Sequence, residues 1–180
     1  APALLAIGCV LMGVTPLPGQ VPSGAAPDYR SLARDILREL VGIQSTESGV
    51  GSTPAAEAVA RRLRAGGFAE GDIRVLGAAP RKQNVVARLR GAGQGRPILI
   101  IGHLDVVDAR KEDWSAGLDP FTLTERDGYF YGRGSTDDKD EAAIHVANLI
   151  RMKREGIVPD RDIIVALTAV FFCGGFAQFL

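Results

Sequence analysis

The sequence has 180 residues, of which 46% are hydrophobic and 23% charged, an ordinary balance for a globular protein with one sizeable core. Lys plus Arg and Asp plus Glu both number 21, so the formal net charge is zero, which gives no electrostatic case for binding nucleic acid or an anionic membrane. The two cysteines, Cys9 and Cys173, lie near opposite ends of the chain and form neither a disulfide framework nor a zinc-finger pattern.

The N-terminal region begins with an uncharged, nearly all apolar run at residues 3–14. This run is too short to cross a bilayer and is typical of the apolar part of a secretory signal. Residues 15–26 are rich in Pro, Gly and Ser, as a linker would be. We therefore expect a signal peptide-like segment and linker over residues 1–27, and a secreted or periplasmic protein. The alternative is a flexible apolar terminus with no targeting role.

Two amphipathic helices are expected next in the chain. Asp28 is suited to cap the first, whose apolar residues recur at helical spacing as far as Val41. The second begins at Thr53-Pro54, with Thr at the N-cap and Pro at the first helical position, and it closes at Gly66.

The remaining elements are strands, one hairpin and one helix. Strands are predicted at residues 73–76, 84–89, 97–102 and 161–169, a hairpin at 121–131, and a helix at 138–155. The continuous apolar run at 97–102 is typical of a fully buried strand. The glycine-rich turn at 91–95 lies between two strands and lacks the Lys and Ser/Thr of a phosphate-binding loop, so we interpret it as a hairpin turn. The interleaved order predicts an α/β fold, with a mixed, mostly parallel sheet and helices on both faces.

A histidine and an aspartate, His103 and Asp105, directly follow the apolar strand. Ligands of open α/β sheets gather beyond the carboxyl ends of strands, and a spacing of two on an extended chain points both side chains the same way. The imidazole could bind a metal, while the carboxylate holds its tautomer and raises its basicity. Taken alone, this three-residue motif is more often a surface histidine with an acidic neighbour.

A second cluster, Asp137-Asp138, lies where a loop meets the predicted third helix. Ionised aspartates are common helix caps, but capping requires neither the preceding Gly132-Arg133-Gly134 nor the following Lys139. A carboxylate can also bridge two cations. Catalytic zinc sites have three protein ligands and structural sites have four, so His103 and Asp137 would be only part of a site.

These residues belong to a series of short motifs in a fixed order. The series is Gly102-His-Leu-Asp-Val-Val107, Trp114, Asp119-Pro-Phe121, Asp127-Gly128, Tyr131-Gly-Arg-Gly134 and Asp137-Asp-Lys139. It resembles the zinc peptidase family that contains glutamate carboxypeptidase, carnosinase, aminoacylase and succinyl-diaminopimelate desuccinylase. The resemblance implies a partial zinc-exopeptidase-like catalytic domain over residues 28–169. It also implies a metallopeptidase or amidohydrolase that acts on a peptide or an N-acyl amino acid.

The resemblance also implies a role for each matching residue. His103 would be a ligand of one zinc ion, and Asp137 would bridge the two zinc ions of a complete family member. Asp105 would be a catalytic residue that orients His103, while Trp114 and Phe121 would line or flank the substrate cleft. The peptide bond that follows Asp137 would be cis.

Two further residues depart from the family pattern. Asp140 replaces a glycine that many members carry after Lys139. His145 matches no family ligand, so we expect it to pack against the core or lie on the surface.

Residues 170–180 depart most strongly from the family. In members of the family, the strand that matches residues 163–169 leads into two adjacent glutamates, one a general base and one a zinc ligand. A dimerisation domain is inserted later in their chains. Here residues 170–180 carry no Asp, Glu or His and include four of the seven Phe. We therefore expect an aberrant apolar tail and an incomplete domain without the dimerisation domain. Weak zinc binding and no useful hydrolysis by this chain alone would follow.

Two alternatives to an active enzyme stay open. One is a non-catalytic fragment that binds a metal or a partner weakly. The other is a protein tethered to a membrane through its apolar tail, although Gly174-Gly175 and Gln178 argue against a stable span.

Overall fold

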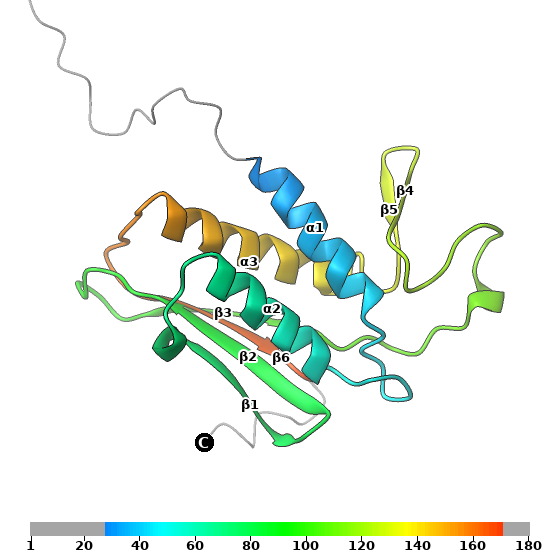
Figure 1. The fold of residues 1–180 in the computed structure, drawn as a ribbon, viewed down its shortest axis with the longest axis horizontal. Helices are drawn as coiled ribbons and strands as arrows, with labels where there is room; N and C mark the ends of the chain where they lie inside the picture. The colour runs from blue at the N-terminus through cyan, green and yellow to red at the C-terminus, as the bar shows by residue number, and fades with distance from the viewer. Residues whose placement is uncertain (1–27, 171–180) are drawn as a thin grey trace, which may run out of the picture.

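The computed structural model describes residues 28–170, so the predicted signal-like segment and nearly all of the predicted apolar tail lie outside the described residues. Three helices and six strands, with two short 3-10 turns, make up this part (Figure 1). The helices are α1 (Tyr29–Gly42), α2 (Thr53–Ala65) and α3 (Lys139–Arg154). The strands are β1 (Ile73–Ala79), β2 (Lys82–Leu89), β3 (Ile98–His103), β4 (Thr124–Arg126), β5 (Tyr129–Tyr131) and β6 (Ile163–Thr168). The turns are η1 (Glu70–Asp72) and η2 (Lys111–Asp113).

The main sheet has four strands in the order β1-β2-β6-β3. The predicted mixed α/β class is confirmed, but the expectation of a mostly parallel sheet was wrong for the described strands. The β1–β2 and β2–β6 pairs are antiparallel, and only β3 and β6 run parallel. The connections explain this, because a parallel pair needs a long crossover. The turn from β1 to β2 is too short for one, whereas the chain between β3 and β6 is long enough to include α3.

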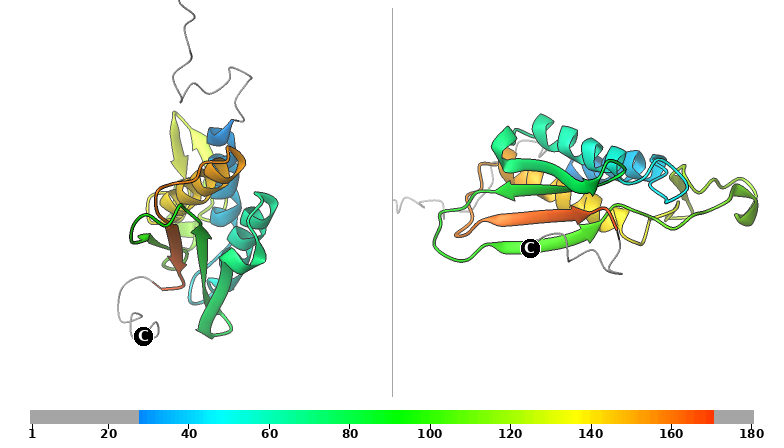
Figure 2. Two further views of the ribbon diagram at one scale, coloured as in Figure 1. Left: turned by 90° about the vertical axis from the view of Figure 1, so that its left-hand side faces the viewer. Right: turned by 90° about the horizontal axis from the view of Figure 1, so that it is seen from below.

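The three helices lie on one face of this sheet, so the expected cover on both faces is wrong for residues 28–170. Figure 2 shows α1, α2 and α3 together on one side of the strands. The helix α2 packs on β1 and β2, while α3 packs on β3 and against α1. Strand alternation sorts the side chains: Val85, Ala87 and Val165 are buried, while the intervening Val86 and Ala166 are only partly covered. One hydrophobic core therefore lies between sheet and helices.

The strand β3 is an edge strand, not the fully buried strand that its apolar run predicts. It has a hydrogen-bonded neighbour, β6, on one side only among the described strands. Ile98, Leu99 and Ile101 are 47%, 57% and 40% exposed. Only at its end, at Gly102 and His103, does the strand become buried, and this is where the candidate site begins.

Local signals placed the helix starts and the hairpin well. Asp28 caps α1 as predicted, and its carboxylate accepts hydrogen bonds from two backbone N–H groups of the first turn. The hairpin turns at Asp127-Gly128 as expected, with φ values of 54° and 80° that suit a two-residue turn. The N-cap of α2 is Ser52 instead of Thr53. The Thr53 hydroxyl is engaged elsewhere, since it donates to Pro80 O at 2.7 Å.

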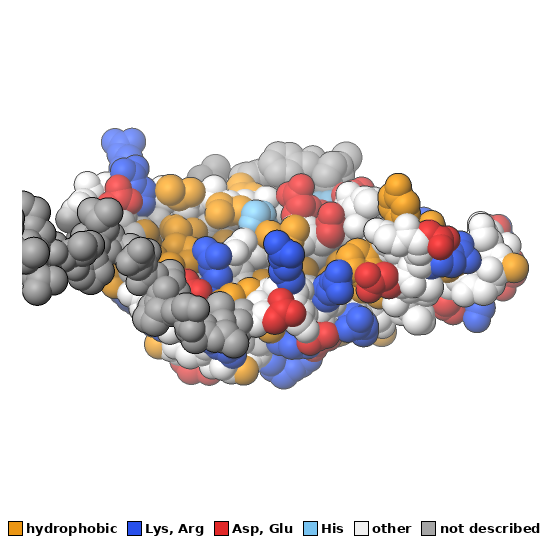
Figure 3. Space-filling view, turned by 90° about the horizontal axis from the view of Figure 1, so that it is seen from above, with side chains coloured by type: hydrophobic (Ala, Val, Ile, Leu, Met, Phe, Trp, Pro, Cys, Tyr) orange, Lys and Arg blue, Asp and Glu red, His pale blue; other side chains and the backbone are white. Residues whose placement is uncertain are grey.

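The helix-side surface mixes charges of both signs. Figure 3 shows Lys and Arg side chains interspersed with Asp and Glu across this face, as the zero net charge leads one to expect. Among residues 28–170, no helix combines the length and apolar character that a membrane span needs.

Candidate metal centre

The end of β3 holds His103. Gly102 and His103 stand beside Leu167 and Thr168 of the parallel strand β6, and the next residue, Leu104, donates its N–H to Thr168 O at 2.9 Å. His103 is 9% exposed. Its imidazole therefore sits at the carboxyl end of two parallel strands, the place where open α/β sheets bind ligands.

Asp137 reaches His103 from a distant part of the chain. Its Oδ1 lies 2.9 Å from His103 Nε2, although 34 residues separate the two. The Asp137 side chain is 78% exposed, so its carboxylate faces solvent on the side away from the ring. The loop before α3 thus brings together the two residues predicted as metal ligands.

Asp105 lies on the other side of the same ring. His103 Nδ1 is 3.1 Å from the Asp105 backbone oxygen and 3.3 Å from its Oδ1. Burial alone would lower the pKa of His103, but hydrogen bonds and charge from Asp105, with a further hydrogen bond from Asp137, outweigh it and raise the pKa to about 9. The expected orienting contact of Asp105 on His103 is therefore present in the geometry.

Asp138 joins the loop before α3 to the end of β3. The His103 backbone N–H donates to Asp138 Oδ2 at 2.8 Å. A side chain at Gly102 would block this contact, because a Cβ there would lie 2.6 Å from the same oxygen. The Asp137–Asp138 peptide bond is cis, as the family resemblance implies.

Lys139 ties the same loop to helix α1. It is fully buried, and its Nζ donates to Leu40 O at 2.7 Å and Ile43 O at 2.8 Å, at the end of α1. Burial lowers the pKa of Lys139 to about 7, and the charge of Asp105 opposes this effect. Its stem packs under Gly134, where a Cβ would lie 2.9 Å from Lys139 Cδ. Asp138 and Lys139 thus anchor the loop that carries Asp137 to β3 and to α1.

A cavity of about 350 Å³ opens beside these residues. His103, Asp105 and Asp137 line it, and so does Trp114, one of the two residues expected near a substrate cleft. Phe121 is not among its lining residues. His145 lies on α3 and is not among the lining residues either.

The donor types fit a divalent metal, but the described residues supply only part of a site. An imidazole nitrogen and a carboxylate oxygen are both common zinc ligands. Within residues 28–170, no group of three or more His, Cys, Asp or Glu side chains is arranged to hold a metal ion. His103 Nε2 and Asp137 Oδ1 are a histidine and a carboxylate donor that approach each other in this part of the chain.

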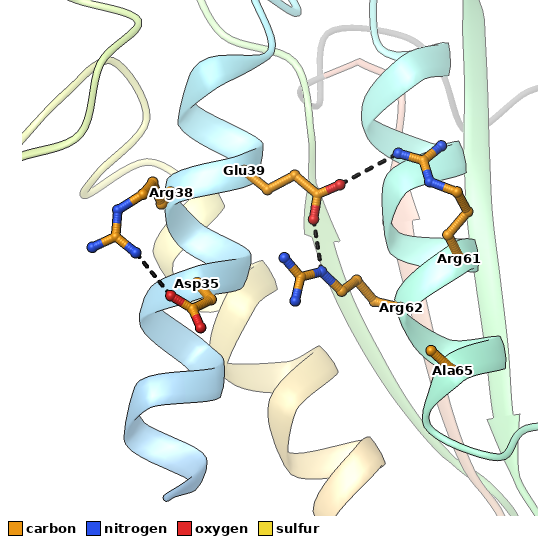
Figure 4. A pocket seen from close by; sticks show the side chains of 6 residues that line it. All are labelled: Asp35, Arg38, Glu39, Arg61, Arg62 and Ala65. Atoms are coloured by element: carbon orange, nitrogen blue, oxygen red, sulfur yellow. Dashed lines mark hydrogen bonds and ion pairs between the residues drawn. The ribbon is translucent and has the colours of Figure 1, made fainter.

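A second hollow, between α1 and α2, is built differently. Figure 4 shows Glu39 of α1 pointing at Arg61 and Arg62 of α2, with contacts of 3.3 Å and 2.7 Å, and Asp35 beside Arg38. The ion pairs join the two helices. The charged side chains drawn in this hollow are therefore paired with one another.

Two residues important to this geometry had no role assigned from the sequence: Asp138 and Lys139. Their signal was present in the motif itself, because capping does not explain the Asp-Asp-Lys run. Asp137 faces the cavity and Asp138 holds the His103 backbone. The loop conformation decides this difference, and local sequence patterns do not report it.

Residues 99–169 match Peptidase family M20/M25/M40. This segment is therefore similar to part of an M20-family domain. A probable succinyl-diaminopimelate desuccinylase from Staphylococcus aureus is 42% identical over 90 residues, which cover 49% of this chain and 21% of that relative. The chain therefore spans about a fifth of the length of this curated relative.

Two solved structures share the fold. Human carnosine dipeptidase 1 aligns with a TM-score of 0.67 at 23% identity, covering 83% of this chain and 34% of that one. A dinuclear metal-binding peptidase of the M20 family from Bacillus subtilis aligns with a TM-score of 0.53 at 16% identity, covering 77% and 35%. The matched segment thus lies in a fold that the chain shares with these two structures.

Proposed function

We propose that this chain carries part of the metal site of a zinc-dependent metallopeptidase or amidohydrolase. The observation that carries the proposal is the 2.9 Å approach of Asp137 Oδ1 to His103 Nε2, at the carboxyl end of β3. The names of the similar proteins, a desuccinylase and a dipeptidase, support hydrolysis of an amide bond. A peptide or an N-acyl amino acid is accordingly the proposed substrate.

The residues of the site have distinct proposed roles. His103 would offer Nε2 to the metal, because its Nδ1 faces Asp105. Asp105 would keep the proton on Nδ1 and fix the plane of the ring, as carboxylates behind metal-binding histidines do. Asp137 would offer its exposed carboxylate. When bound, zinc would polarise the amide carbonyl and acidify a water molecule.

The choice of zinc rests on ligand chemistry. A mixed imidazole and carboxylate set suits zinc better than magnesium or calcium, which prefer oxygen alone. Two ions are proposed, supported by the dinuclear metal site named for the Bacillus subtilis structure. Asp137 would contact both ions; this is supported by one of its oxygens approaching His103 while the side chain is 78% exposed.

Zinc titration of the full chain tests the site. We expect zinc to bind the chelator-treated chain, and His103→Ala and Asp137→Ala each to weaken binding about tenfold or more, since each removes a ligand from an already small set. His145→Ala is the matched control, because it removes the only other histidine and leaves the cavity intact. Equal zinc affinity in wild type and His103→Ala would reject this site.

Hydrolysis is measured on the same samples with a dipeptide and an N-acyl amino acid. Activity that EDTA and His103→Ala both abolish supports catalysis by this chain. Zinc binding without hydrolysis instead favours the second candidate, a non-catalytic metal-binding chain. The small donor set of the described residues is the observation that keeps this candidate open.

A further inference from the structure

The edge strand β3 directs part of its backbone away from the sheet. The N–H groups of Ile98 and Leu104 both donate, at 2.9 Å, to carbonyls of the segment that contains β6. Successive residues of a strand bond in opposite directions, so the N–H and C=O groups of Leu99 and Ile101 point outward. Within residues 28–170, no second strand pairs with β3 on that side. The outer edge therefore offers two residues ready for a strand ladder.

This outward ladder is closed at both of its ends. Before it stands Pro97, which has no backbone N–H to donate. After it stands His103, whose N–H already donates to Asp138 Oδ2 at 2.8 Å. Leu99 and Ile101 are therefore the two positions between these limits whose outward N–H groups a partner strand can use.

The two outer strands of the sheet differ in how their edges are protected. Edge strands commonly avoid pairing with other chains through charged side chains or an irregular register. The strand β1 has both, an exposed Arg74 and a register shift between Leu76 and Ala79. The strand β3 has a regular register with β6, and residues 97–102 carry no charge. The β3 edge is thus the one open to a partner.

A second copy of β3 fits this edge when the two strands run antiparallel about Ile100. Leu99 of each copy then lies opposite Ile101 of the other, and each of these pairs exchanges both N–H···O bonds. The neighbouring registers use the edge less well. A centre at Leu99 sets Ile101 opposite Pro97, which has no N–H. A centre at Ile101 sets Leu99 opposite His103, whose N–H is already used.

We propose that the outer edge of β3 is an interface between two copies of this chain, which joins their sheets into one continuous sheet. The same patch serves both copies, as in the two-fold dimers that are commonest among homo-oligomers. Leu99 and Ile101 of opposite copies then form apolar cross-strand pairs, and no like charges face each other along residues 97–102. This interface goes beyond the proposed function and requires neither a metal nor hydrolysis.

Disulfide trapping tests the register. Leu99→Cys and Ile101→Cys are prepared separately in the full chain, with Cys9 and Cys173 replaced by serine. We expect covalent dimers when the two variants are mixed and oxidised, because opposite Cα atoms would lie about 5.5 Å apart, within disulfide range. Either variant alone should give few, because its two cysteines would lie diagonally, about 7–8 Å apart. Equal yields from one variant alone, or no covalent dimer from the mixture, would overturn the pairing.

Sedimentation equilibrium of Leu99→Pro separates edge pairing from contact between sheet faces. The Leu99 N–H points away from β6, so proline removes the outward donor and leaves the bonds to β6 in place. We expect the dimer Kd to rise about tenfold or more, since each copy loses one intermolecular hydrogen bond. Val86→Lys is the matched control, because it puts a charge on the same sheet face but on β2, beyond β6. An equal loss in both variants contradicts edge pairing.

The wild-type chain decides whether a second copy is the occupant of the edge. A monomer–dimer equilibrium that depends on concentration is the expected result. A chain that stays monomeric at every concentration overturns the proposal. If such a chain forms dimers only after residues 171–180 are deleted, that segment and not a second copy occupies the edge. The trapping experiment uses two exposed positions, so it still decides the matter if Leu99→Pro fails to fold.

Discussion

His103 is held between two carboxylates, and this decides its charge in the metal-free protein. Asp105 contacts Nδ1 and Asp137 contacts Nε2, so both ring nitrogens can act as donors only when the imidazole is protonated. The raised pKa, about 9, means that a metal must displace a proton to bind Nε2.

We expect Asp105→Asn to lower the pKa of His103 from about 9 towards its ordinary value of about 6.5, because the largest favourable interactions of the imidazolium come from Asp105. NMR titration of the metal-free chain measures this directly, since the sequence has two histidines and His145 provides the internal control. If the pKa of His103 stays near 9 in Asp105→Asn, another group sets it.

The same shift has a consequence for stability with a definite sign. The folded-state pKa of His103 lies above its ordinary value, so the protonated ring stabilises the folded protein. This stabilisation is fully present below about pH 6.5 and is lost as the pH rises through about 9. The stability difference between wild type and Asp105→Asn should therefore narrow across that pH range. Urea unfolding at several pH values measures it.

At the level of elements, the loop before α3 is fixed by buried contacts to both of its neighbours. Asp138 accepts from the His103 N–H at the end of β3, while Lys139 reaches two carbonyls at the end of α1. The geometry of the candidate site therefore depends on how α1, α3 and β3 pack, as well as on the ligands themselves.

Lys139→Met tests this link, because it keeps an unbranched apolar stem but removes the donors to Leu40 O and Ile43 O. We expect a loss of about 1–3 kcal/mol in the free energy of unfolding, measured in urea, since charge-assisted hydrogen bonds of a buried group are lost. Glu39→Gln is the control, a change in a partly exposed ion pair that should cost about 1 kcal/mol or less. If Lys139→Met leaves the free energy of unfolding unchanged, the cost of burying the lysine charge cancels the gain from its two hydrogen bonds.

The elements themselves could be predicted where the signal is local. The Asp28 cap, the Asp127-Gly128 turn and the helical spacing of α1 each act within a few residues, and each was placed correctly. The apolar run of β3 was misread, because a continuous apolar strand can be buried on both faces or can leave one face uncovered. Strand order and helix placement depend on long-range pairing, which periodicity does not report.

The candidate site shows the same division. The motifs identified His103, Asp105 and Asp137, and the fold brings these three together. The motifs gave no role to Asp138, which accepts the His103 N–H, or to Lys139, which donates to two carbonyls at the end of α1. Such a property belongs to three-dimensional neighbours, so it is invisible in the sequence alone.

For the molecule as a whole, the helices cover one face of the sheet and leave the other open among the described residues. Paired positions put Leu99 beside Ile164 and Ile101 beside Ala166 on that face. Among the strands of residues 28–170, β3 also has a hydrogen-bonded neighbour on one side only. An apolar face next to a free edge is prone to association with another chain.

We therefore expect the chain to self-associate as its concentration rises, and Leu99→Lys to reduce this association. Leu99 is 57% exposed and lies on the edge strand, so a lysine there costs little folding free energy but places a charge on the open face. Ile144→Lys is the matched control, because Ile144 is 50% exposed on helix α3, away from that face. Sedimentation velocity at several concentrations measures the change. If both variants reduce association equally, general apolar exposure and not the β3 edge drives it.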